Sequence, residues 1–215
     1  MLKFPSPLYA VADDTASEQP LAVQVEWLLE AGVRLIQLRC KRLGDDALRP
    51  LARAAVAQCR ARGAWLIVND RVEIARDAGA HGVHLGQGDR TPAQARAVLG
   101  EDFLIGYSTH DEVEFARGLA GPADYLALGP VFATHTKEVP YADLGVEGVR
   151  RFAARKDRPL VAIGGISAGD AAELLAAGAD AVAVIGALWR APDPRAAAAA
   201  LLRAVGGPTA AARDL

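Results

Sequence analysis

The sequence predicts a single (β/α)₈ barrel. Short apolar segments alternate with helical segments eight times, and no linker or change of composition interrupts the alternation. Of the 215 residues, 52% are hydrophobic but only 6% are aromatic, which suits helices packed on a buried sheet. We therefore expect one domain over residues 1–215, with a loosely ordered tail from about residue 206.

Charge, cysteine content and hydropathy exclude several classes of protein. The net charge is -2 and no segment is dense in Lys or Arg, so neither nucleic acid nor a membrane surface is an expected partner. Cys40 and Cys59 are too few and too far apart for a disulfide framework or a zinc site. With no signal peptide or long apolar run, we expect a cytoplasmic protein that acts on small molecules. The sequence does not determine the oligomeric state, and a homodimer is one assembly that it permits.

Each element is predicted from its periodicity and its boundary residues. Strands, which are apolar runs ended by polar residues or glycine, are expected at 8–12, 33–39, 65–68, 82–85, 103–107, 124–128, 160–163 and 181–185. Helices are expected at 19–31, 45–62, 72–78, from Thr91 onward, and at 111–118, 146–155, 167–177 and 194–205. Thr91 and Ser167 are the expected N-caps of their helices. An open doubly wound sheet would also alternate, but no Gly-x-Gly-x-x-Gly follows the first strand, which favours the barrel.

Barrel enzymes build their sites where the strands end, so polar residues at these positions are informative. After the second strand, Gln37, Arg39 and Lys41 share one face because strand side chains alternate, while Leu38 and Cys40 share the other. The first three are therefore candidates for the barrel opening. The alternative is that Arg39 and Lys41 belong to a solvated loop.

Acidic and amide side chains follow the third and fourth strands. Asn69, Asp70 and Asp89 offer the oxygen ligands that suit Mg²⁺, which commonly takes one or two carboxylates and completes its shell with water and phosphate. The alternatives are that Asp70 caps a helix and that Asp89 forms a turn beside Gly88.

Anion-binding features follow the last three strands. The segment 129–137 contains two hydroxyls and a cation, at Thr134, Thr136 and Lys137. The seventh and eighth strands end at Gly164-Gly165 and Ile185-Gly186, where backbone N–H groups can approach a phosphate, although ordinary tight turns would also explain the glycines.

The remaining candidates are a serine and the histidines. Ser108, at the end of the fifth strand, is a candidate donor to substrate, and Thr109 a candidate N-cap. His81 and His84 lie three apart on a strand and so point to opposite faces, which argues against joint metal ligation. His110 and His135 have acid–base chemistry, but an extended loop would point His135 away from its flanking threonines.

Together these segments resemble the thiamine phosphate synthase family, from Leu8 to about Leu188. The matching motifs, in order, are Gln37-Leu38-Arg39-Cys40-Lys41, Asn69-Asp70, His84 to Asp89, Gly106-Tyr107-Ser108, Gly129 to Lys137, and Ile163-Gly164-Gly165-Ile166. The resemblance implies that a hydroxymethylpyrimidine diphosphate is joined to a hydroxyethylthiazole phosphate, with release of diphosphate and a requirement for Mg²⁺. Such a reaction needs charge neutralisation on the leaving group and no protein nucleophile.

The same resemblance implies roles for the strand-end residues. The pyrimidine diphosphate would be held by Gln37, Arg39, Lys41, Asn69 and Lys137. The metal would be held by Asp70 and Asp89, and the leaving diphosphate by Ser108. The thiazole phosphate would be bound by Thr134 and Thr136, with backbone groups at Gly165, Ile185 and Gly186. Arg39, Lys41, Ser108 and Lys137 would be the catalytic residues.

The sequence departs from the family pattern at two positions. The family commonly has Glu in place of Cys40 and Ser in place of Gly186; the second change removes a hydroxyl from the phosphate site but leaves its N–H. Two alternative functions remain. The related thiazole tautomerase carries His in place of Pro130, and proline cannot act as an acid or base. A non-enzymatic regulator would not need the charged set at the strand ends.

Overall fold

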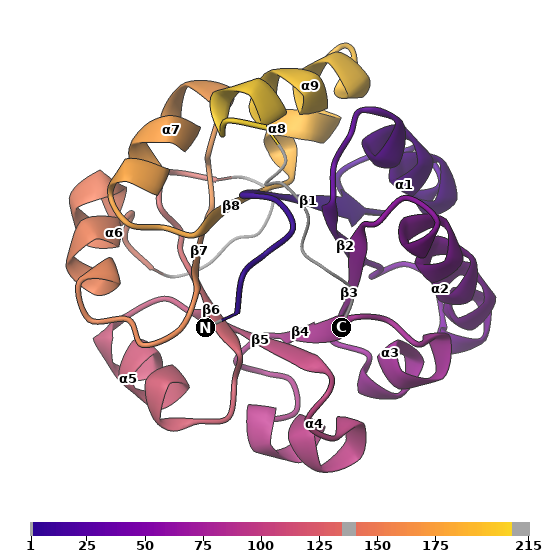
Figure 1. The fold of residues 1–215 in the computed structure, drawn as a ribbon, viewed down its shortest axis with the longest axis horizontal. Helices are drawn as coiled ribbons and strands as arrows, with labels where there is room; N and C mark the ends of the chain where they lie inside the picture. Colours follow the sequence, from indigo (N-terminus) through magenta and orange to yellow (C-terminus); the bar gives the residue numbers. More distant parts are fainter. Residues whose placement is uncertain (1, 135–140, 208–215) are drawn as a thin grey trace.

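The structure is a computed structural model that describes residues 2–134 and 141–207. Its strands close into a parallel barrel in chain order, and the helices form a ring around it (Figure 1). The strands are β1 (Leu8–Asp13), β2 (Leu35–Arg39), β3 (Trp65–Asn69), β4 (Gly82–Leu85), β5 (Leu104–Thr109), β6 (Tyr125–Leu128), β7 (Leu160–Ile163) and β8 (Ala181–Val184). The helices are α1 (Leu21–Glu30), α2 (Asp45–Arg60), α3 (Val72–Ala78), α4 (Pro92–Leu99), α5 (Glu112–Ala120), α6 (Gly145–Ala153), α7 (Ala168–Ala176), α8 (Gly186–Trp189) and α9 (Pro194–Ala204).

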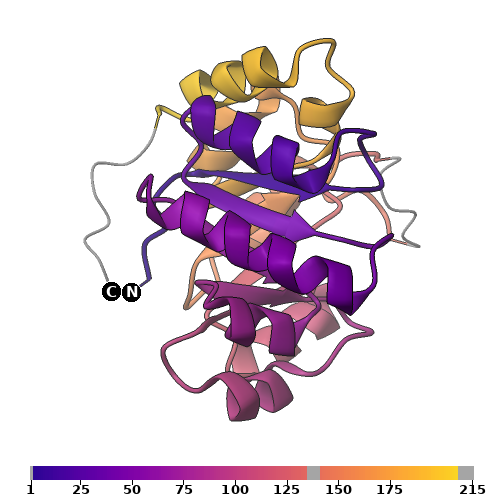
Figure 2. The ribbon, with the colours of Figure 1, turned by 90° about the vertical axis from the view of Figure 1, so that its right-hand side faces the viewer.

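The fold class predicted from the sequence is confirmed, and so is the division of β2 into two faces. Leu38 and Cys40 lie in the large apolar cluster between strands and helices, whereas Gln37 and Arg39 line a cavity inside the barrel. In the side view, the indigo and purple helices α1 and α2 lie across the outside of the barrel (Figure 2). Within the described ranges, no helix is long and apolar enough to cross a membrane.

The end of the barrel where the strands begin, here called the floor, is filled by the segment before β1. This segment crosses the centre of the ring in Figure 1. Phe4 packs edge-on against Tyr125, with ring centroids 5.3 Å apart, and joins a second apolar cluster inside the barrel. The opposite end, where the strands finish, is here called the mouth.

Two of the expected helix starts are confirmed and one is wrong. Thr91 and Ser167 each form a capping box at the start of α4 and α7. Thr109, in contrast, belongs to β5, where its buried hydroxyl donates to the carbonyl of Ala127 over 3.1 Å. The N-cap of α5 is Asp111, which accepts from a backbone N–H of the helix.

The short helix α8 was not expected from the sequence. Four residues are too few to produce a helical period of apolar side chains. Its position depends on a distant contact: the indole of Trp189 donates to the carbonyl of Val11 over 2.7 Å. The predicted tail is described only as far as residue 207, and residues 208–215 lie outside the described part of the chain.

Candidate active site

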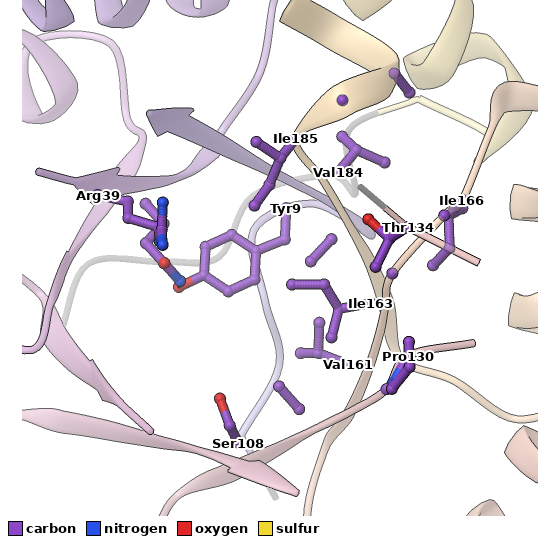
Figure 3. Close-up of a pocket in the computed structure, with 18 of the residues that line it drawn as sticks. Tyr9, Arg39, Ser108, Pro130, Thr134, Val161, Ile163, Ile166, Val184 and Ile185 are labelled. Carbon is purple, nitrogen blue, oxygen red and sulfur yellow. The ribbon is translucent and has the colours of Figure 1, made fainter. Parts of the chain in front are cut away.

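A cavity of about 360 Å³ lies at the mouth of the barrel. It brings together eight residues that the sequence selects from six different strand ends: Gln37, Arg39, Asn69, Ser108, Thr134, Gly165, Ile185 and Gly186. In Figure 3, Arg39 and Thr134 lie on opposite sides of the cavity, with the ring of Tyr9 between them. Two further candidates, Thr136 and Lys137, together with His135, lie outside the described residues. The cavity therefore has a cationic side and a hydroxyl and glycine side.

The cationic side is built around Arg39. Its Nη1 donates to Asp13 over 2.5 Å and to the hydroxyl of Thr15 over 3.2 Å. Asp13 is fully buried and also accepts from the backbone N–H groups of Thr15 and Ala16, so its position is held by the turn after β1. The alternative that Arg39 belongs to a solvated loop is wrong, because it ends β2 and its side chain is only 16% exposed. Lys41, in contrast, follows the end of β2, has a side chain that is 38% exposed and does not line the cavity.

Asp14 holds the segment after β2 in place. Its carboxylate accepts from the backbone N–H groups of Lys41 and Arg42 over 2.8 and 2.9 Å, and from the thiol of Cys40. Burial acts to raise the pKa of Asp14, but these hydrogen bonds outweigh it and lower the pKa below its usual value. Sequence reasoning missed Asp13 and Asp14. The signal available was an acidic pair directly after the first strand.

Lys41 and the two predicted metal ligands form a cluster beside the cavity. The Nζ of Lys41 forms an ion pair with Asp70, and Asp70 and Asp89 share a hydrogen bond. Burial and then the hydrogen bond with Asp70 raise the pKa of Asp89. For Asp70, burial is outweighed by the hydrogen bonds with Asp89 and Lys41, so its pKa is lowered. The two carboxyl groups therefore lie within hydrogen-bonding distance of each other, so both can face a single cation.

The backbone of Asp70 supports this arrangement. Its φ is 63°, in the left-handed region that few residues other than glycine adopt without a cost in free energy. The alternative that Asp70 caps the next helix is wrong, because the N-cap of α3 is Arg71 and no side chain caps it. Asp89 does form the predicted turn, since it accepts from the N–H of Gly86 over 2.7 Å. It does so while contacting Asp70.

The donor set fits Mg²⁺ bound together with a phosphate. Over residues 2–134 and 141–207, no group of three or more His, Cys, Asp or Glu side chains could hold a metal. Two neighbouring carboxylates remain, at Asp70 and Asp89, with the amide of Asn69 in the adjacent cavity wall. Mg²⁺ is commonly bound by one or two carboxylates plus substrate phosphates, so this sparse set suits it.

The opposite side of the cavity is shaped by close contact of two backbones. The loop after β6 bonds to the end of β7 through Val131 N–H to Ile163 carbonyl and Phe132 N–H to Gly164 carbonyl, each over 3.0 Å. Gly165 has φ 67°, and a Cβ there would lie 2.6 Å from the carbonyl oxygen of Ala133. Only glycine fits this position, so the approach of the two backbones explains the glycine pair after β7.

The barrel interior contains polar side chains that the sequence did not connect. His84 lies between Ser108 and Tyr125, with Nε2 2.9 Å from the serine hydroxyl and Nδ1 3.1 Å from the tyrosine hydroxyl. The backbone carbonyl of Ser108 also accepts from Gln87 over 2.6 Å. Ser108 is therefore held both at its side chain and at its backbone.

The other described histidines have separate environments. His81 accepts a hydrogen bond from the N–H of Leu66 and stacks on Trp65, while His84 points into the cavity, so joint metal ligation is excluded as expected. Burial, aided by the nearby Arg60, lowers the pKa of His81 to about 4. His110 lines the cavity, but its Nδ1 is 2.7 Å from Glu114.

The family and its relatives agree with this geometry. The family described as thiamine monophosphate synthase matches residues 8–188. The thiamine-phosphate synthase of Chromobacterium violaceum is 47% identical over 197 residues, which cover 90% of this chain and 93% of that one. The enzyme of the same name from Azorhizobium caulinodans is 43% identical over 195 residues, with 90% and 92% covered.

A solved structure with the same barrel is also similar in sequence. Thiamine phosphate pyrophosphorylase from Pyrococcus furiosus superposes with a TM-score of 0.85 and 32% identity, over 93% of this chain and 95% of that one. The matched region contains every strand of the barrel and every described residue that lines the cavity except Arg190. The chain therefore belongs to the thiamine monophosphate synthase family, whose members are transferases.

Proposed function

We propose that this protein makes thiamine phosphate by joining a hydroxymethylpyrimidine diphosphate to a hydroxyethylthiazole phosphate, with release of diphosphate. The observation that carries the proposal is a single cavity with Arg39 on one side, beside the Lys41–Asp70 ion pair, and with Thr134 and glycine backbone on the other. Two anionic substrates can occupy its two sides, with the pyrimidine carbon that loses diphosphate and the thiazole nitrogen that bonds to it lying between them. The names of relatives at 42–47% identity support the same activity.

The chemistry is the departure of diphosphate from the pyrimidine, which leaves a cation stabilised by the pyrimidine amino group. The transition state gains negative charge on the leaving group, and preorganised cations stabilise that charge most effectively where water is excluded. Arg39 is oriented for this by Asp13, and Lys41 by Asp70. Ser108 would add a hydrogen bond to a diphosphate oxygen, and Gln37 and Asn69 would hold the pyrimidine portion.

Asp70 and Asp89 are the residues that would hold Mg²⁺. When bound, Mg²⁺ would supply further positive charge to the leaving diphosphate. Lys41, held by its ion pair with Asp70, would lie beside the diphosphate and add to this positive charge. Lys137 would complete the cationic side; this role rests on the sequence.

The thiazole phosphate would bind on the opposite side of the cavity. Thr134 supplies a hydroxyl there, and Gly165, Ile185 and Gly186 supply backbone groups from the ends of β7 and β8. Because Gly186 replaces a serine of the family pattern, this chain would rely on backbone N–H at that position. Thr136 would contribute a second hydroxyl, again from the sequence alone. A cytoplasmic location and a homodimer stay predictions.

The test is to measure thiamine phosphate and released diphosphate together, with both substrates, with and without Mg²⁺. We expect equal amounts of the two products, dependence on Mg²⁺, and no thiamine phosphate when either substrate is left out. Folded protein that makes neither product would overturn the proposal. A thiazole isomerisation assay in the same preparation separates the tautomerase alternative, which the proline at position 130 in the cavity wall disfavours.

A further inference from the structure

Five side chains form a continuous hydrogen-bonded chain through the interior of the barrel. The Nε2 of Gln37 is 3.0 Å from the hydroxyl of Tyr9, which is 3.0 Å from the hydroxyl of Tyr125. That hydroxyl is 3.1 Å from Nδ1 of His84, whose Nε2 is 2.9 Å from the hydroxyl of Ser108. The chain links β2 to β5 by way of β1, β6 and β4, and both ends face the cavity.

The backbone is shaped to permit this chain. A Cβ added to Gly106 would lie 2.1 Å from Cζ of Tyr125 and 2.5 Å from Nδ1 of His84. The φ of Gly106 is not in the left-handed region, so its conformation does not require glycine. The missing side chain instead makes the space in which Tyr125 and His84 meet.

The positions of the donors give the chain a direction. An amide nitrogen can only donate, so the hydroxyl of Tyr9 accepts from Gln37. The Tyr9 hydroxyl can then donate its own proton to Tyr125, which is one of the two directions open to this pair of hydroxyls. In that direction Tyr125 donates to Nδ1 of His84, and the proton of the neutral imidazole then lies on Nε2. His84 then donates to Ser108. Burial raises the pKa of both tyrosines well above the usual value, so both hydroxyls keep their protons.

We propose that Tyr9, Tyr125 and His84 are positioning residues that make the hydroxyl of Ser108 a donor toward the cavity. Because Ser108 accepts from His84, its own proton is directed away from the histidine, toward the site of the departing diphosphate. That the acceptor is the departing diphosphate rests on the proposed function. The tautomer of His84 does not depend on that function. The hydrogen-bonded chain also links the sites of the pyrimidine and of the diphosphate. Gln37, at the pyrimidine end, sets the direction of hydrogen-bond donation that reaches Ser108.

The first test needs no substrate. Nitrogen-15 NMR of the imidazoles at pH 8 distinguishes a protonated from an unprotonated ring nitrogen, and with four histidines in the chain the signals of His84 are assigned by their loss in His84→Gln. We expect a proton on Nε2 and none on Nδ1. A proton on Nδ1, alone or together with Nε2, would overturn the proposal. Tyr125→Phe should then give a mixture of the two tautomers.

The second test is a double-mutant cycle on turnover. We expect Tyr125→Phe and Ser108→Ala each to lower kcat about tenfold or more, and the double variant to be no slower than Ser108→Ala alone. KM for the thiazole phosphate should stay unchanged. The matched control is Tyr141→Phe, which removes a hydroxyl that donates to Glu114 over 2.8 Å and is not part of the hydrogen-bonded series. Its effect on kcat should add to that of Ser108→Ala.

A merely structural role for Tyr125 predicts additive losses in the cycle, and that result would overturn the inference. Should Tyr125→Phe fail to fold, Tyr9→Phe breaks the same chain and takes its place. His84→Gln keeps a donor near Ser108 whereas His84→Asn does not, so the first should retain more activity. Wild-type protein without synthase activity would overturn only the proposed function. The NMR result would still decide the direction of hydrogen-bond donation along the five side chains.

Discussion

Both ends of the barrel hold buried or half-buried arginines, but these bind different kinds of partner. At the floor, the guanidinium of Arg158 donates to four backbone carbonyls, those of Gly118, Leu119, Gly121 and Ala123. Arg96 similarly donates to the carbonyls of Gly100, Phe103 and Pro122 and to the carboxylate of Asp124. At the mouth, both hydrogen bonds of Arg39 to described residues use Nη1, so Nε and Nη2 remain for a ligand.

The difference separates cations that hold the fold together from a cation that we propose binds substrate. A guanidinium whose donors are bonded to carbonyls of its own fold connects loops and has no capacity left for substrate. A cation held at one point by a carboxylate is oriented yet still able to bind an anion, which is what catalysis by charge requires. We therefore expect substitutions at the floor to lower stability and substitutions at the mouth to lower activity.

The largest expected effect is on turnover, at the mouth. Lys41→Ala should lower kcat by roughly 100-fold or more, because a cation near the leaving group is lost. Unfolding free energy should change by less than about 1 kcal/mol, since the lysine is 38% exposed and exposed ion pairs stabilise little. Steady-state kinetics and urea denaturation measure the two. The control is Arg49→Ala, which breaks an ion pair with Asp77 away from the cavity and should leave kcat within about twofold.

At the floor the division should reverse. Arg158→Ala removes the donors of four carbonyls, and we expect about 2–4 kcal/mol of destabilisation with kcat per folded molecule nearly unchanged. Chemical denaturation and active-site titration provide the measurement. Arg150→Ala, whose partner Glu147 is itself largely exposed, is the matched control and should cost almost nothing. A large fall in kcat for Arg158→Ala would break the proposed division.

Gly165 tests whether the glycines at the mouth serve binding. Gly165→Ala combines a strained φ with a contact of 2.6 Å to the carbonyl of Ala133, so the loop after β6 must move. We expect KM for the thiazole phosphate to rise about tenfold, a change of about 1.4 kcal/mol, while KM for the pyrimidine diphosphate stays within about twofold. Gly63→Ala has a similar φ of 60° with open space around it, so it should show only a modest loss of stability and normal KM values.

The last expected effect appears only on acidification and lies at the floor. Because the pKa of His81 is about 4 in the folded chain and about 6.5 when unfolded, the unfolded state binds more protons between these values. Stability from this group is therefore full above pH 6.5 and is lost as pH falls toward 4. After allowing for partial exposure, we expect on the order of 1–2 kcal/mol.

His81→Asn is the comparison for that pH dependence. Its amide oxygen can accept the hydrogen bond of Leu66 that Nδ1 accepts in the native chain, but it does not titrate. Urea midpoints measured at pH 7, 5.5 and 4.5 should fall more steeply for the native protein than for the variant. Parallel slopes would show that His81 does not contribute, and activity at pH 7 should be the same in both.

Much of the site could be predicted because a barrel converts order along the chain into position. Every parallel strand ends at the same face, so Gln37, Arg39, Asn69, Ser108 and Thr134 could be placed at one cavity before any contact was known. Period-two alternation also separated Cys40 from its neighbours. What could not be predicted is what holds these side chains. Asp13 lies 26 residues from Arg39, and local spacing says nothing about that pairing.

The sequence by itself determined the (β/α)₈ fold, the strand ends and the chemical character of the site, because periodicity and composition are local properties. Only the tertiary structure decided that Tyr9 and Tyr125, 116 residues apart, meet inside the barrel beside His84. The physical reason is closure of the sheet. Residues that look like ordinary core aromatics along the chain become hydrogen-bond partners when β1, β4 and β6 face one another, and Gly106 leaves the space for them to meet.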